Sequence, residues 1–248
     1  MDKVMVITGG GRGIGAATAL LAAEAGYSVA INYLANRTAA EEVLQGMKKK
    51  GSKAIAVPGD VSREADVVRL FEETDRALGR VSVLVNNAGI VDKGMRVEQM
   101  SAERIARMLA INVTGSFLCA REAVKRMSKR HGGPGGAIVN VSSIAAKLGG
   151  SGEYVDYAAS KGAIDTFTIG LSKELGPDGI RVNGVRPGII RTDIHLASGD
   201  PGRLERIGAM APLGRPGEPE EIARAILWLA SGEASYASGA ILDVSGGR

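Results

Sequence analysis

The sequence predicts an α/β fold with a parallel β-sheet that carries helices on both faces. Seven apolar runs of strand length recur along the chain, and their continuous apolar character is typical of strands buried on both sides. Helix-length segments separate these runs, and alternating strands and helices imply right-handed crossovers and parallel strands. A length of 248 residues, with 45% hydrophobic and 23% charged residues, fits one domain without linker or repeat. We therefore expect residues 1–248 to form a single doubly wound domain.

Apolar runs, helix-length segments and glycine stop signals give the order of the secondary-structure elements along the chain. The expected strands are residues 4–8, 28–33, 53–59, 81–87, 136–143, 180–188 and 240–246. The expected helices include residues 14–26, 64–79 and 102–127. Gly26 and Gly79 are stop signals for the first two helices. Residues 193–219 break the alternation, because they are polar and rich in glycine and proline. An insertion of this length is typical of a functional lid, so we expect a substrate lid there.

Composition narrows the class of protein. The net charge of +4 is mild, and basic residues are interspersed with acidic ones, as on an ordinary solvated surface. With three phenylalanines and one tryptophan, the chain lacks the interleaved aromatics of a nucleic-acid binder. No run of 18 apolar residues and no basic-then-apolar leader occurs, so we expect a cytoplasmic protein without a membrane partner.

Cysteine and histidine usage gives no sign of a disulfide or a metal. Cys119 is the only cysteine, which rules out an intrachain disulfide, and its surroundings "GSFLCAREA" indicate buried helix packing. His131 and His195 lack the partner spacing of a metal site, and no cluster of ligating residues occurs. Surface or capping roles are expected for both histidines, although His195 lies in the expected lid and can touch a substrate there.

The stretch "TGGGRGIG", residues 8–15, follows the first strand and opens the first helix. Gly9 allows a tight turn there. Gly13 and Gly15 let the backbone approach a pyrophosphate and let the helix pack on the strand, with helix N-terminal amides facing the anion. A glycine pattern alone also fits a plain strand–helix turn. Its place at the first β–α junction favours a dinucleotide.

The end of the second strand indicates which dinucleotide. NAD sites usually carry an acid there to bond the ribose 2′-hydroxyl, but this chain reads "INYLANR", with Asn32, Tyr33 and Asn36. The missing acid removes a repulsion toward a 2′-phosphate, and Arg12 and Arg37 can both pair with that dianion. NADP is therefore favoured over NAD. Arg37 equally fits an exposed residue at the start of a helix. Arg12 is therefore the stronger evidence for a 2′-phosphate site.

Further short motifs follow at strand ends. They are "NNAG" (86–89), Asn112, "SS" (142–143), "YAASK" (157–161) and "RPGIIRT" (186–192). With the glycine loop, and in this order, they make the chain resemble the classical short-chain dehydrogenase/reductases over essentially its whole length. The resemblance implies a Rossmann-like domain with a seven-stranded parallel sheet. It also implies a homotetramer that transfers a hydride between NADP(H) and a small-molecule carbonyl or secondary alcohol.

The resemblance also implies the site residues. The catalytic set is Asn112, Ser143, Tyr157 and Lys161, with Ser142 as the competitor of Ser143. The cofactor would be held by the glycine loop, the end of the second strand, Asp60–Val61 at the adenine, residues 87–89 and the loop 187–192 at the nicotinamide carboxamide. In full, the implied cofactor set is Gly9, Arg12, Gly13, Ile14, Gly15, Asn32, Tyr33, Arg37, Asp60, Val61, Asn87, Ala88, Gly89, Tyr157, Lys161, Pro187, Gly188, Ile190 and Thr192.

The pair Tyr157 and Lys161 has a chemical rationale of its own. Residues i and i+4 share a helix face, and a free phenol with a pKa of about 10 is a poor acid–base group at neutral pH. A nearby ammonium favours the phenolate, so we expect Lys161 to lower the pKa of Tyr157 and to bond the nicotinamide ribose. Tyr157 then exchanges a proton with the substrate oxygen, which Ser143 helps to position. Asn112 is expected to hold a helix kink and a water that links Lys161 to solvent.

Several alternatives stay open on the substrate side. The expected substrate residues are Ser143, Tyr154 and Tyr157. Tyr154 either packs under the lid or lines the pocket, and the pocket wall is favoured. The basic helix end at 126–130 suggests docking of an acidic acyl-carrier protein, as for a 3-oxoacyl-carrier reductase. Asp178 stands where that branch commonly has a basic residue, which weakens the case for docking of a carrier protein. The segments around Asn36 and Tyr154 resemble sugar, polyol or general carbonyl reductases more closely. An alternative from another class is a catalytically silent NADP sensor, but such proteins typically lose the tyrosine or lysine.

Overall fold

The computed structural model describes residues 3–194 and 202–248. Seven parallel strands form one sheet in the order β3-β2-β1-β4-β5-β6-β7. The strands are β1 Val4–Ile7, β2 Ser28–Tyr33, β3 Ala54–Pro58, β4 Val83–Asn86, β5 Gly136–Val141, β6 Ile180–Pro187 and β7 Ile241–Val244. Each of them lies within one of the expected apolar runs, so the predicted parallel sheet is confirmed.

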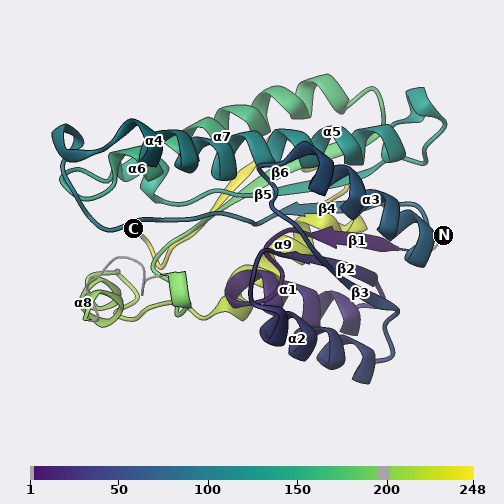
Figure 1. The fold of residues 1–248 in the computed structure, drawn as a ribbon, viewed down its shortest axis with the longest axis horizontal. Coiled ribbons are helices and arrows are strands. Elements are labelled where there is room, and N and C mark those ends of the chain that lie inside the picture. Colours follow the sequence, from purple (N-terminus) through teal and green to yellow (C-terminus); the bar gives the residue numbers. More distant parts are fainter. Residues whose placement is uncertain (1–2, 195–201) are drawn as a thin grey trace.

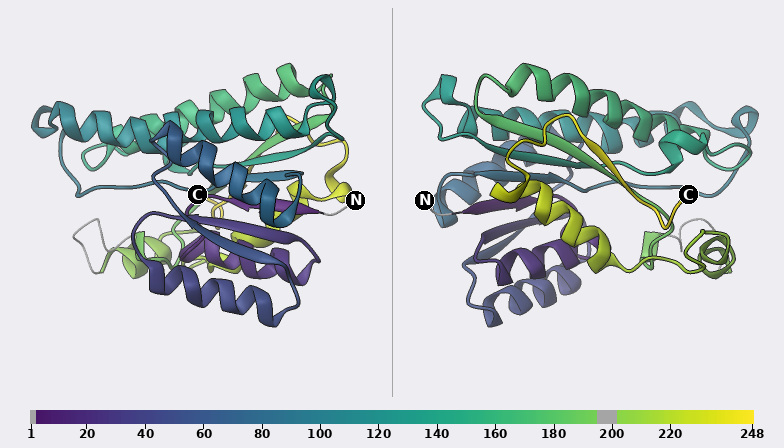
Figure 2. Two further views of the ribbon diagram at one scale, coloured as in Figure 1. Left: turned by 45° about the vertical axis from the view of Figure 1, so that its right-hand side comes forward. Right: turned by 180° about the vertical axis from the view of Figure 1, so that it is seen from behind.

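Helices cover both faces of this sheet. They are α1 Gly13–Glu24, α2 Arg37–Lys49, α3 Glu64–Leu78, α4 Ala102–Leu109, α5 Gly115–Met127, α6 Ala145–Leu148, α7 Val155–Leu175, α8 Arg203–Ala209 and α9 Pro219–Ala230. Figure 1 shows α1 and α2 below the sheet and α3, α4, α5 and α7 above it. Seen from behind in Figure 2, α9 lies beside α1, with which it makes extensive contact. The doubly wound Rossmann-like architecture is therefore confirmed.

The two faces of the sheet bury two separate cores. Met5 and Ile7 of β1 pack with α1, α2 and α9, whereas Val4 and Val6 pack with α3 and α5. Successive strand residues point to opposite faces, so burial on both faces needs an unbroken apolar run. Cys119 is 1% exposed in the second core. Burial raises the pKa of its thiol to about 12, so it is a packing residue, as expected.

The helix ends follow the glycine signals. Gly79 ends α3 with φ 94°, and Gly26 has φ 81° just after α1. The segment 102–127 is not one α-helix, because a π-helical turn at Ala110–Thr114 separates α4 from α5. Asn112 lies in this turn, so the irregularity expected at Asn112 is a π-helical turn.

The topology fixes where a site can lie. β1 pairs with β2 on one side and β4 on the other, and the crossovers leave in opposite directions from this point. In such sheets, ligands bind outside the carboxyl ends of the strands at the reversal. The segment expected to form a lid, residues 193–219, is described at 193–194 and 202–219 and carries α8 beyond that edge (Figure 1). A bridge joins Ile190, three residues before this segment, to Gly217 near its end. His195 and the rest of 195–201 lie outside the described residues.

No helix within residues 3–194 and 202–248 combines the length and apolar character needed to cross a bilayer.

Candidate active site

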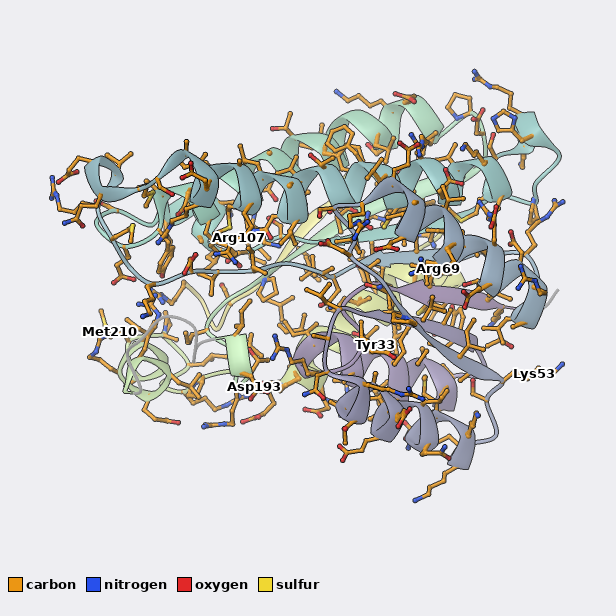
Figure 3. All side chains as sticks on the ribbon, in the orientation of Figure 1. Tyr33, Lys53, Arg69, Arg107, Asp193 and Met210 are labelled. Carbon is orange, nitrogen blue, oxygen red and sulfur yellow. The ribbon has the colours of Figure 1, made fainter. Side chains whose placement is uncertain are left out.

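A long cavity of about 680 Å³ runs along the carboxyl edge of the sheet. Figure 3 labels Tyr33, the last residue of β2, and Asp193, where the chain enters the lid segment, and both line the cavity. Most of the expected cofactor residues also line it. They are Gly9, Arg12, Gly13, Ile14, Asn32, Tyr33, Asp60, Val61, Asn87, Ala88, Gly89, Tyr157, Lys161, Pro187, Gly188, Ile190 and Thr192. Gly15 and Arg37 are not part of the lining.

The glycine loop has a shape that other residues could not adopt. Gly9 and Gly13 have φ of 62° and 54°. A Cβ on Gly9 would lie 3.0 Å from the Cα of Ala88, and one on Gly13 would lie 3.1 Å from the Thr192 side chain. Gly15 lies beneath the loop, where a Cβ would come within 2.4 Å of the Gly9 carbonyl oxygen. Helix α1 begins at Gly13, and its first amides lack helical partners, so this cradle fits a pyrophosphate.

A brace that the sequence reasoning missed holds this loop in place. The Thr8 hydroxyl accepts hydrogen bonds from the backbone N–H groups of Asn87 and Ala88, each at 3.0 Å. The Asn87 side chain donates to the carbonyl oxygens of Thr8 and Gly9 at 2.8 and 3.1 Å. The loop is thus fixed to the end of β4, and the threonine that opens "TGGGRGIG" was the available signal.

Asn32 has a bracing role as well. It is 4% exposed, and its amide accepts from the Gly9 N–H at 3.4 Å and donates to the Gly59 carbonyl at 2.8 Å. Both ends of its amide are therefore used to join the glycine loop to the end of β3. Asp60 is likewise engaged, because it accepts from the Ser62 N–H and hydroxyl at 2.9 and 2.7 Å.

The two arginines expected near a 2′-phosphate lie in different places. Arg12 is exposed and lines the cavity. Arg37 is directed to solvent, with a side chain that is 78% exposed and an ion pair to Glu41 at 2.6 Å. Residues 32–36 all line the cavity, and none of them is acidic.

Helix α7 brings the expected acid–base residues together. The Lys161 Nζ lies 5.7 Å from the centre of the Tyr157 ring and donates to the Val141 carbonyl at 2.8 Å. Ser143 lines the same cavity and is close enough to the Tyr157 hydroxyl to oppose the rise in its pKa. Ser142 is instead buried and donates to the Lys161 carbonyl at 3.1 Å. The two serines therefore face different partners, and Ser143 is the one beside the phenol.

Asn112 supports this group from behind the cavity wall. It is 1% exposed, and its amide accepts from the Ile90 N–H at 2.8 Å and donates to the Ile90 carbonyl and the Ser160 hydroxyl at 3.0 Å each. A Cβ on Gly89 would lie 3.3 Å from Asn112 Oδ1 and 3.4 Å from Lys161 Nζ. Asn112 thus clamps the segment after β4 to α7, close to the lysine.

Comparison with known proteins places this geometry in a family. A family model described as "Enoyl-(Acyl carrier protein) reductase" matches residues 9–248. The Escherichia coli protein named "Uncharacterized oxidoreductase YgfF" is 54% identical over 245 residues, which are 99% of each chain. The chain belongs to the classical short-chain dehydrogenase/reductase family. It is therefore an oxidoreductase that acts on small molecules, of a family that uses NAD(P).

Other members of the short-chain dehydrogenase/reductase family agree over the full length. "Versicolorin reductase 1" of Aspergillus parasiticus is 38% identical over 256 residues, covering 99% of this chain and 95% of that protein. A short-chain dehydrogenase/reductase from Serratia marcescens superposes with a TM-score of 0.90 at 33% identity, over 99% and 97% of the two chains. A blue fluorescent protein from a metagenomic library, solved with NADPH, also gives 0.90, at 34% identity and the same coverage.

The electrostatics of this short-chain dehydrogenase/reductase differ from the sequence expectation. Burial raises the pKa of Tyr157 to about 12, and the neighbouring Ser143 hydroxyl opposes the rise only partly. Burial also lowers the pKa of Lys161 to about 8. The expectation of a lowered Tyr157 pKa is thus wrong for this structure, because the cost of desolvating the phenolate is the largest effect on this group. Tyr157 is a neutral phenol at neutral pH.

Tyr154 links the site to the lid segment. Its ring meets that of Tyr157 edge to face, with centres 5.9 Å apart, and it lines the cavity. Its hydroxyl accepts a hydrogen bond from Arg203 of α8, which is 9% exposed and also pairs with Glu153 at 2.6 Å. Tyr154 therefore both lines the cavity and packs against the lid segment. Sequence reasoning missed Arg203, because its partners are some 50 residues away along the chain.

Proposed function

We propose that the protein is an NADP(H)-dependent oxidoreductase of carbonyls and secondary alcohols, with a site formed by Ser143, Tyr157, Lys161 and Asn112. The observation that carries the proposal is that Ser143, Tyr157 and Lys161 line one cavity, with the Lys161 amine 5.7 Å from the centre of the Tyr157 ring. Two hydroxyls in one cavity can both hydrogen-bond the oxygen of a bound carbonyl group.

Each residue has a role that follows from its surroundings. A bound nicotinamide would supply or accept the hydride. Tyr157, a neutral phenol below a pKa of about 12, gives its proton to the carbonyl oxygen, while Ser143 holds that oxygen by a hydrogen bond. The Lys161 ammonium stabilises the phenolate that forms, and Asn112 keeps the surrounding backbone in place. The neutral phenol favours carbonyl reduction near neutral pH.

The choice of NADP rests on charge. The cavity beside β2 is lined by Arg12 and by five non-acidic residues, 32–36. A 2′-phosphate there meets a guanidinium and no carboxylate from the end of β2. The glycine cradle described above fits the pyrophosphate of either dinucleotide. The related fluorescent protein solved with NADPH supports the same choice.

The substrate side favours a small carbonyl compound over an acyl-carrier protein. Arg126 pairs with Asp75 and Glu122, at 2.7 and 3.1 Å. Arg130 pairs with Asp178 at 3.2 Å. These basic groups are thus neutralised within the chain, which weakens docking of an acidic carrier. We propose that residues 193–219 form the substrate lid of the single domain, because Arg203 and Ile207 of α8 line the cavity.

Substitution of the two tyrosines tests the proposal. The wild-type protein should oxidise NADPH with members of a panel of ketones and aldehydes, followed at the nicotinamide absorbance. Tyr157→Phe should lower the rate about 100- to 10,000-fold, because it removes the general acid. Tyr154→Phe is the matched control and should keep the rate within about tenfold. Robust turnover by Tyr157→Phe would overturn the assignment, and NADPH binding without turnover by the wild-type protein would indicate the silent sensor.

A further inference from the structure

A line of alternating charges leads to Lys161 through the protein. The Lys147 amine pairs with Asp243 at 2.5 Å, and the other Asp243 oxygen pairs with Arg186 at 3.1 Å. Arg186 pairs in turn with Asp165 Oδ2 at 2.9 Å. These four residues come from α6, β7, β6 and α7. Asp165 lies four positions after Lys161 on α7, so the two share a face and Lys161 extends the alternation.

The Asp165 carboxylate is only half satisfied. The residue is 9% exposed, and Oδ2 accepts the Arg186 hydrogen bond. Its other oxygen, Oδ1, is buried and has no hydrogen-bond partner in the described part of the chain. Buried carboxylate oxygens are normally paired, because an unpaired one loses its hydration without compensation. Arg186 therefore offsets the negative charge of Asp165 through one oxygen only, and the remaining field acts on Lys161, four positions before it on the helix.

Among the described groups around the Lys161 amine, Asp165 is the one that carries a charge. From β5 the Val141 carbonyl faces the amine, and Gly89 and Asn112 lie close on another side. None of these is charged. On α7 itself, Tyr157 is neutral below a pKa of about 12. Burial lowers the pKa of Lys161 to about 8, and Asp165 is the charge that opposes this fall.

We propose that Asp165 is a positioning residue that holds Lys161 in its ammonium form during catalysis, with Arg186 setting the strength of that effect. The proposal rests on the role of Lys161 in the proposed function. Arg186 directly precedes Pro187 and Gly188, the first residues of the expected nicotinamide loop. The same ion pair thus links the helix that carries Tyr157 and Lys161 to that loop.

Two substitutions that break the same ion pair should have opposite effects. The measurement is the pH dependence of kcat/KM for a carbonyl at saturating NADPH, where activity falls as Lys161 loses its proton. Asp165→Asn removes the carboxylate charge, so this fall should move to lower pH by about one unit. Arg186→Gln leaves Asp165 charged and uncompensated, so the fall should move to higher pH. Asp165→Glu should restore the wild-type profile, and Asp165→Ser replaces the asparagine variant if that one does not fold.

A purely structural ion pair predicts a different result. Both variants would then lose stability and rate without moving the profile, and this outcome would overturn the proposal. A second readout does not need turnover. The coupling free energy of unfolding between Asp165→Asn and Lys161→Met should be larger at pH 7 than at pH 10, because the amine is charged only below its pKa. Equal coupling at both values overturns the proposal. If the wild-type protein shows no turnover, the proposed function is contradicted. The coupling free energy of unfolding still tests the interaction of Asp165 with Lys161.

Discussion

At the scale of single residues, substitutions of Arg12 and Arg37 test how the protein recognises the 2′-phosphate of NADPH. Arg12 lines the cavity, whereas Arg37 is turned to solvent and paired with Glu41. We expect Arg12→Leu to lower kcat/KM for NADPH about 10- to 100-fold, the value of a charge-assisted hydrogen bond, and to change kcat/KM for NADH little. Arg37→Leu is the control and should change neither value by more than about twofold. A larger loss in Arg37→Leu than in Arg12→Leu would contradict this assignment.

Residue identity could be predicted from the sequence better than residue electrostatics. The spacing of Tyr157 and Lys161 correctly made them neighbours on one helix face. It gave the wrong direction for the Tyr157 pKa, because helical spacing carries no information on how deeply both groups are buried. Desolvation depends on the elements that close over the site. The role of Asp165 was out of reach for the same reason, since its partner Arg186 comes from another strand.

At the scale of elements, the contact between α8 and the start of α7 should control substrate access. Arg203 is the described link, because it bonds Tyr154 and Glu153 just before α7. Arg203→Met should loosen the lid segment and raise KM for the carbonyl about tenfold, with a smaller change in kcat. Arg215→Met breaks the ion pair to Glu221 at 2.7 Å, away from the cavity, and serves as the control. Equal KM values in the two variants would show that α8 does not act as a lid through Arg203.

Element boundaries show what a pattern of apolar residues leaves undetermined. The strands could be predicted because burial on both faces of the sheet requires an unbroken apolar run. The ends of α1 and α3 could be predicted because a left-handed backbone conformation there favours glycine. The π-helical turn around Asn112 leaves none, because residues 102–127 are compatible with one continuous helix. Its contacts to Ile90 and Ser160 lie 22 and 48 residues away along the chain. Such tertiary contacts favour the turn, and they become visible only in the folded protein.

At the scale of the whole molecule, the homotetramer that the family resemblance implies needs a contact between copies, and α5 and α7 carry exposed apolar residues. Phe117 of α5 is 49% exposed and Ile169 of α7 is 43% exposed. Phe117 also stacks on Phe167 with ring centres 3.9 Å apart. Large exposed apolar patches on soluble proteins mark interfaces. We therefore propose that α5 and α7 pair with the same helices of another copy, as in an isologous contact.

A charged residue at this surface should split the assembly. The wild-type chain of 25.6 kDa should elute from size exclusion with light scattering at about four times that mass. Phe117→Glu places a carboxylate in the contact and should shift the mass to a dimer or monomer, because a buried unpaired charge is unfavourable. Val97→Glu, at a residue that is 63% exposed and lies outside α5 and α7, is the control and should keep the wild-type mass. A wild-type protein that elutes as a monomer would mean that the apolar surface of α5 and α7 is not a contact between copies.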